Sequence, residues 1–154
     1  MINAFSIKFM TMVGIFTFIL SCDTSKSASS NQLVSIEMES AGMSGMTQFT
    51  ASKTKMVEKS VKRSESSQES VKSVSKSDLT QYWNNITELV ADLDIDDFEN
   101  LKSPTQDRLF DGARATVITI HFKNKTMTSA AFDEGNPPAE LKALYDYLVS
   151  VVNQ

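Results

Sequence analysis

The chain has 154 residues, the size of one domain, and 41% of them are hydrophobic, which is enough to build a core. Its net charge of −4 gives no general attraction for nucleic acid or anionic lipid, so nucleic acid is excluded as an expected partner. The single cysteine excludes a disulfide within the chain.

The N-terminal part contains a short apolar stretch, residues 9–20, which follows Lys8. A helix needs about 20 apolar residues to cross a bilayer, whereas about 10–14 are typical of the core of a signal peptide. Residues 22–32 are polar and rich in serine, a composition that buries too little surface to order the chain. The sequence therefore predicts a signal peptide at 1–21, a flexible tether at 22–32 and a single domain at 33–154.

The junction between the first two segments resembles the lipobox of bacterial lipoproteins. Ile19 fits its branched aliphatic position, Leu20 is bulkier than the residue usual at its position, Ser21 fits the small position and Cys22 is the lipid-modified residue. The resemblance implies cleavage before Cys22 and acylation of its thiol and new amino group, because two or three acyl chains hold a protein stably on a membrane. It implies a bacterial lipoprotein, anchored by its N-terminal lipid, expected in the outer membrane and facing the periplasm or the exterior.

Three other interpretations of this segment stay open. Ordinary secretory cleavage would leave Cys22 as a free thiol, an uncleaved apolar stretch would act as a membrane anchor, and a cytosolic protein would bury the stretch in its core. Only the lipoprotein interpretation attaches the chain to a membrane through Cys22.

The folded part begins with an alternating segment, residues 33–39. Val34, Ile36 and Met38 lie on one side of an extended chain with this spacing, so the segment predicts a half-buried strand with these three side chains in the core.

Further strands are predicted up to residue 77. The two glycines in 41–45 favour a turn, 46–51 should return as a second strand, and 56–61 favours a third, weaker strand. Residues 60–77 are rich in serine and predict a mobile or edge segment with one short strand at 70–74.

Residues 78–93 predict an amphipathic helix with Ser77 or Asp78 as its N-cap. Its apolar side chains recur every three or four positions, which places them on one buried face: Leu79, Tyr82, Trp83, Ile86, Leu89, Val90 and Leu93.

The second half predicts a turn of helix at 96–101, a loop at 103–112 and a β-branched strand at 114–123. Residues 126–132 should pair with that strand, and a final helix should begin near Pro138. The buried stripe predicted for this helix is Leu141, Leu144, Tyr145, Leu148, Val149 and Val152. Together these elements predict an α+β fold, an antiparallel sheet of four to five strands with two helices packed on it.

The alternating carboxylates Asp92, Asp94 and Asp96 match the start of a calcium loop, but Asp97 stands where such a loop needs glycine and Ser103 where it needs glutamate. No metal site is therefore predicted. Because these acids oppose the helix dipole, a counter-charge such as Arg108 or a lysine is expected nearby.

His121 is the only histidine and shares the side of its predicted strand with Val117 and Thr119, which indicates an exposed strand residue. Without a second histidine, a free nucleophilic thiol or a glycine-rich phosphate loop, the chain lacks the parts of hydrolase, redox and nucleotide chemistry. No catalytic residue and no cofactor is predicted. The expected role is binding or envelope structure, with a protein partner whose identity stays open.

From residue 33 onward the chain contains, in this order, Ala41-Gly42-Met43-Ser44-Gly45, Ser103-Pro104 with Asp107, Phe132-Asp133, and Pro137-Pro138-Ala139-Glu140-Leu141 with Leu144. This order of features is similar to that of emfourin-type inhibitors of thermolysin-like metallopeptidases. The resemblance implies a shared fold and, as an alternative function, peptidase inhibition through a protruding loop, 42–45 or 135–138; it assigns no inhibitory residue.

Overall fold

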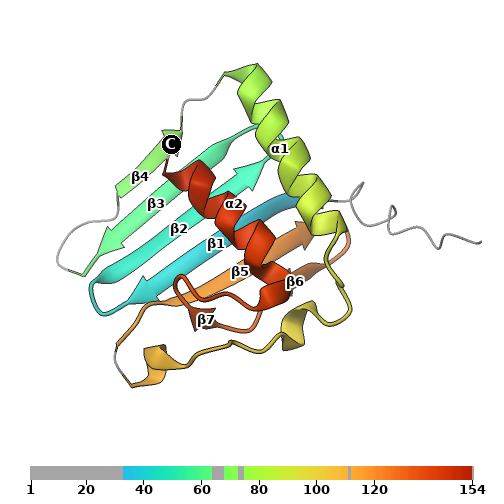
Figure 1. The fold of residues 1–154 in the computed structure, drawn as a ribbon. Helices are drawn as coiled ribbons and strands as arrows, with labels where there is room; N and C mark the ends of the chain where they lie inside the picture. The colour runs from blue at the N-terminus through green and yellow to red at the C-terminus, as the bar shows by residue number, and fades with distance from the viewer. Residues whose placement is uncertain (1–32, 64–67, 73–74, 111, 154) are drawn as a thin grey trace, which may run out of the picture.

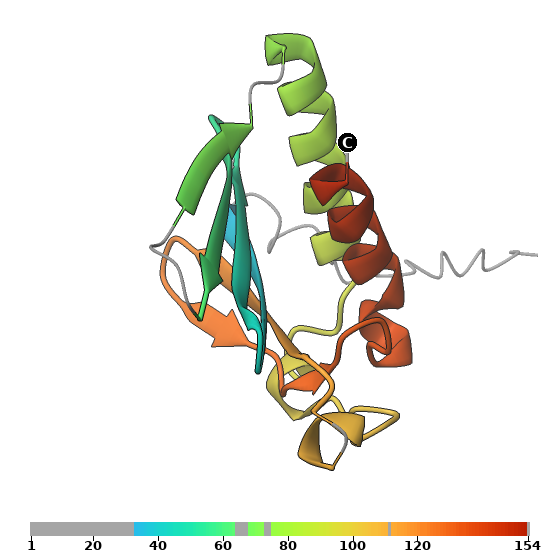
Figure 2. The same cartoon turned by 90° about the vertical axis from the view of Figure 1, so that its left-hand side faces the viewer.

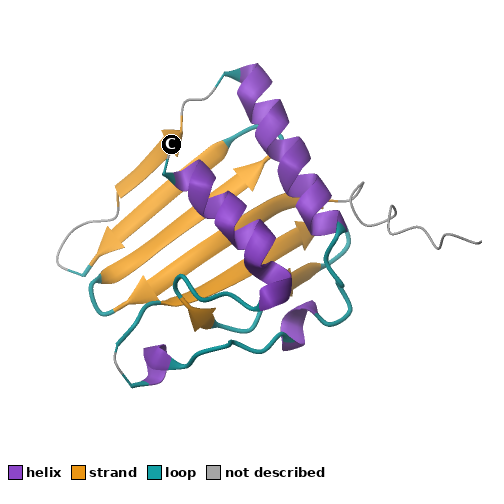
Figure 3. Ribbon diagram, viewed as in Figure 1, coloured by secondary structure: helices purple, strands orange, loops and turns teal. Residues whose placement is uncertain are grey.

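The structure is a computed structural model and describes residues 33–63, 68–72, 75–110 and 112–153. One antiparallel sheet carries two α-helices on the same face (Figures 1 and 2). The strands are β1 (Leu33–Gly42), β2 (Gly45–Ser52), β3 (Met56–Lys62), β4 (Gln68–Lys72), β5 (Ala115–Phe122), β6 (Thr126–Thr128) and β7 (Phe132–Asp133). The helices are α1 (Lys76–Ala91), α2 (Lys142–Val152) and the short 3₁₀ turns η3 (Phe98–Asn100), η4 (Asp107–Leu109) and η5 (Ala139–Leu141) (Figure 3).

The strand order is β4-β3-β2-β1-β5-β6, with β7 also paired to β5. The first four strands form consecutive hairpins, and α1 then carries the chain back across the sheet so that β5 pairs with β1. The predicted α+β class, with an antiparallel sheet and two packed helices, is confirmed. The sheet has seven strands, more than the four to five predicted, because the segment predicted as one strand at 126–132 forms two short strands, β6 and β7, which both pair with β5.

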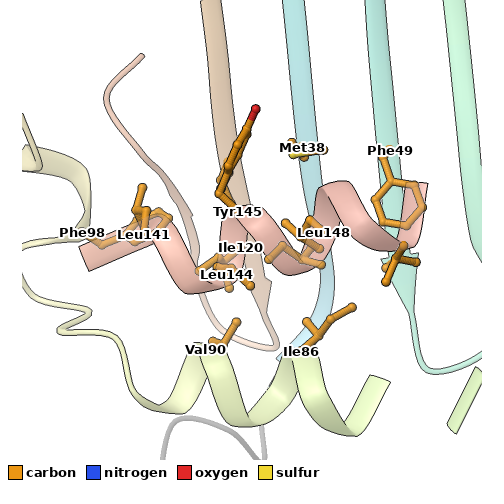
Figure 4. Packing of buried hydrophobic residues seen from close by; sticks show 14 of the residues in the cluster. Met38, Phe49, Ile86, Val90, Phe98, Ile120, Leu141, Leu144, Tyr145 and Leu148 are labelled. Carbon is orange, nitrogen blue, oxygen red and sulfur yellow. The ribbon is translucent and has the colours of Figure 1, made fainter. Parts of the chain in front are cut away.

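The hydrophobic core lies between the sheet and the two helices (Figure 4). The alternation predicted for the sheet and the three-to-four spacing of the helices both point at this layer. Side chains with at most 2% exposure fill it: Ile36, Phe49, Ile118 and Ile120 from the sheet, Ile86 and Val90 from α1, and Leu144 and Leu148 from α2.

The prediction that Val34 is in the core is wrong. The pairing of β1 with β5 shifts register between Leu33 and Ser35, which makes a bulge at Val34 and leaves this side chain 53% exposed. Leu33 packs against the core instead.

The helix ends also differ from the predictions. Helix α1 begins at Lys76, and its N-cap is Ser75, whose hydroxyl accepts a hydrogen bond from the backbone N–H of Asp78 at 3.1 Å.

The buried face of α2 also differs from the prediction, because Val151 is buried, whereas Val149 and Val152 are only partly buried. No described helix has the length and apolarity needed to cross a membrane.

No element of the described ranges covers the second face of the sheet (Figure 2). Its middle is polar: the Gln48 side chain donates to Glu37 at 3.2 Å, and His121 Nε2 lies 3.4 Å from Glu37 Oε1. Towards the β1–β2 turn, the face becomes apolar, and the candidate site lies there.

Candidate functional site: an apolar surface at the β1–β2 turn

The β1–β2 turn is a close-packed structure that depends on glycine. Gly42 pairs with Gly45 across the turn, and Gly45 has φ 141°, a backbone conformation that favours glycine. A Cβ at Gly45 would lie 2.2 Å from the carbonyl oxygen of Val61 in β3. The backbone N–H of Arg63 donates to the Ser44 carbonyl at 3.3 Å, so β3 also holds the turn. Met43 is thereby fixed at its tip.

Gly45→Ala should lower the free energy of unfolding by about 3 kcal/mol or more, because it combines a strained backbone with a clash against the β3 backbone. Gly135→Ala is the matched control: Gly135 also has a positive φ, of 86°, but a Cβ there meets nothing within 4 Å. The control should lose only the ~1–2 kcal/mol of backbone strain. Urea denaturation of both variants measures the difference, and equal losses would contradict the proposed clash.

A second loop, 103–110, lies beside this turn and is fastened by the buried carboxylate of Asp133. Thr105 Oγ1 donates to it at 2.6 Å, the backbone N–H of Asp107 at 2.7 Å and that of Arg108 at 3.1 Å. The Arg108 guanidinium adds an ion pair at 3.0 Å. Burial raises the pKa of Asp133, but these hydrogen bonds together outweigh burial and hold the pKa well below its usual range. The loop is therefore held by a carboxylate that is ionised at neutral pH.

Asp133→Asn should lower the melting temperature at pH 7 by several degrees, because it leaves Arg108 without its carboxylate partner. Folding lowers the pKa of Asp133, so the ionised carboxylate contributes to the free energy of unfolding. This contribution is complete above the unfolded-state pKa of about 3.9 and is lost as the pH falls toward the folded-state pKa. The difference in melting temperature between the wild type and Asp133→Asn should therefore become smaller in acid. Melting curves from pH 7 down to about pH 2 test this. Asp107→Asn, which keeps the backbone donor, is the control; a gap that does not change with pH would contradict the assignment.

The two loops expose large apolar side chains at the same end of the sheet. Met43 is 74% exposed, Leu109 62% and Phe110 83%. The loops lie against each other, since a Cβ on Gly112 would stand 3.4 Å from Met43 Sδ. Clustered exposed hydrophobic side chains of this size mark interaction sites more often than scattered ones do.

A groove of about 830 Å³ is lined by residues of the turn, of the loop and of the sheet between them. Its floor is the apolar end of the uncovered sheet face, formed by Ala41, Met46, Val61 and Ala115. Loop residues including Met43 and Leu109 form its walls, and both charged side chains among the described lining residues are arginines, Arg63 and Arg108. We call the groove, together with Met43, Leu109 and Phe110, the hairpin-end surface.

The predicted lipid-attachment residue Cys22 and its neighbours Ile19, Leu20 and Ser21 lie outside the described residues. His121 lies on the uncovered face with its Nδ1 3.1 Å from Thr126 Oγ1, but it is half-buried, with 30% of its side chain exposed, where an exposed residue was predicted. In the described ranges, no three His, Cys, Asp or Glu side chains are grouped so as to hold a metal ion.

Arg108, named as a possible counter-charge for the acidic helix end, has its ion pair with Asp133. This pairing arises because β7 brings Asp133 next to the loop that carries Arg108.

Leu109 and Phe110 were not predicted as site residues. The sequence feature that could have identified them is a pair of bulky apolar residues inside a segment whose composition is otherwise typical of a loop.

Comparisons with protein-family models, with curated proteins and with solved structures gave no match to this chain.

Proposed function

We propose that this protein is a lipid-anchored lipoprotein of the bacterial cell envelope that binds a protein partner through the hairpin-end surface. The observation that carries the proposal is that Met43 and Leu109, each more than 60% exposed, line one groove, while Phe110, 83% exposed, follows Leu109 in the chain. Exposing them to water is costly in the free protein, and a partner that covers them would recover the hydrophobic free energy.

The position of this surface fits a tethered binding protein. Strand β1 starts at Leu33, directly after the predicted tether, and runs for 10 residues to the turn. An extended strand of this length spans about 30 Å. The hairpin-end surface therefore lies at the end of β1 away from Leu33, where the predicted tether would join the domain (Figure 1). A partner can contact it without contacting the point of attachment.

The surface is also held in shape before binding. The glycine turn is packed against β3, and the neighbouring loop is fastened to Asp133 by four contacts. Rigid loops lose less conformational entropy on association than mobile ones, which favours affinity.

The test uses the full-length protein in its native membrane. A Leu109→Ser, Phe110→Ser double variant should lose a specifically co-purifying protein, because most of the exposed apolar area is removed. Val34→Ser is the control, since Val34 is also an exposed apolar residue but lies at the tether end. Both variants should keep the wild-type melting temperature. Identical sets of co-purifying proteins in all three samples would refute the proposal.

The alternative function is inhibition of a thermolysin-like metallopeptidase, which the resemblance to emfourin-type proteins suggests. A specific observation favours the 42–45 loop over the 135–138 loop for this role: Met43 is exposed, whereas Pro137 and Pro138 are buried. Titration of thermolysin with the protein tests it. Inhibition at stoichiometric amounts, lost in Met43→Asp, would support this alternative, and full protease activity at molar excess would exclude it.

A further inference from the structure

The shape of the groove suits an extended chain. Ala and Gly provide half of its described lining residues: Ala41, Gly42, Gly45, Gly112, Ala113 and Ala115. Small side chains let another backbone approach the sheet closely, while Met46 and Val61 offer apolar contact. A volume of about 830 Å³ is that of a ligand site for several side chains.

The charged side chains among the described lining residues of the groove are opposite in sign to the net charge of the chain. The whole protein carries a net charge of −4, yet the charged residues of the described lining are Arg63 and Arg108. Asp133 offsets the charge of Arg108, whose Nη1 is held by Asp133, Ser103 and the Thr105 carbonyl. Arg63 is exposed, and its guanidinium has no carboxylate partner in the described part of the chain. Among the described lining residues, Arg63 therefore carries the positive charge that Asp133 does not offset.

From these observations we propose that the groove binds an extended peptide segment of the partner protein that carries apolar side chains and at least one carboxylate. The carboxylate pairs with the guanidinium of Arg63, which can form two parallel hydrogen bonds to it. This inference rests on the proposed protein-binding function. A membrane surface is the less favoured occupant, because the groove is hollowed and lined by small side chains, which suits an extended chain better than a flat surface.

The experiment measures the fluorescence anisotropy of two labelled peptides with the purified full-length protein in detergent. One peptide alternates leucine with aspartate, and the other has asparagine in place of each aspartate. The aspartate peptide should bind at least about tenfold more tightly, and this preference should fall to about twofold or less in Arg63→Gln and at high salt. Lys123→Gln removes one positive charge from the far end of the sheet and should leave the preference unchanged.

The outcomes separate this inference from the function on which it rests. If both peptides bind equally and the Leu109→Ser, Phe110→Ser variant abolishes both, the carboxylate preference is refuted while protein binding stands. If neither peptide binds although the native partner still co-purifies, the peptide class is wrong. If the protein without residues 1–22 binds vesicles containing anionic lipid, and Phe110→Ser abolishes this, a membrane is the occupant and the inference is overturned.

Discussion

Leu144→Asp is expected to unfold the domain. Leu144 lies in α2 and is 1% exposed, in the layer that also holds Ile120 and Val90 (Figure 4). A carboxylate there would lose its hydration without a partner, at a cost of several kcal/mol, and the lost leucine packing costs a further ~2–5 kcal/mol. A domain of this size is stable by only about 5–15 kcal/mol, so the sum removes most or all of its stability.

Circular dichroism during heating measures this effect. Ala143→Asp is the control, because Ala143 is the adjacent residue of α2 and is exposed, so its variant should melt within a few degrees of wild type. A cooperative transition at the wild-type temperature in Leu144→Asp would show that α2 does not pack on the sheet as described.

Cys22→Ser is expected to release the protein from the membrane. Serine cannot take the place of the thiol in lipid attachment, so the variant lacks the acyl chains, each of which contributes ~0.8 kcal/mol per buried CH₂. Cell fractionation should find the wild type in the membrane pellet and the variant in the soluble fraction. Ser27→Ala, a change in the same predicted tether, should behave as wild type.

Labelling with radioactive fatty acid gives the second measurement for Cys22. The wild type and Ser27→Ala should be labelled and Cys22→Ser should not. Equal label in all three proteins would exclude acylation at Cys22. A variant without label that still sediments with membranes would favour the uncleaved-anchor interpretation of residues 9–20.

The regular elements could be predicted because their apolar residues repeat with the period of the structure they form. Ile36 and Met38 on β1, and Trp83, Ile86 and Val90 on α1, all face the core as their spacing indicates. The error at Val34 has a physical cause: a bulge depends on how two distant strands align, and that alignment leaves no trace in the local alternation. The N-cap of α1 was predicted at Ser77 or Asp78 and is Ser75, because several serines in that region can cap a helix and the sequence does not distinguish between them.

The candidate site was harder to predict because it is assembled from segments far apart in the chain. The glycine turn was recognised as a loop, but nothing local indicates that the loop carrying Leu109 and Phe110 lies beside it. That placement depends on Asp133, which is 28 positions from Thr105 and lies in β7, paired with β5. Non-local contacts of this kind also determine that Arg108 pairs with Asp133.

The central claim of protein binding through the hairpin-end surface is tested most directly by site-specific photo-crosslinking in intact cells. A photoreactive amino acid replaces Phe110 in one strain and Val34 in another, so that the same full-length protein reports from its two ends. The proposed function predicts a discrete protein adduct from position 110 and none from position 34. No adduct at position 110, or the same adducts from both positions, would contradict it.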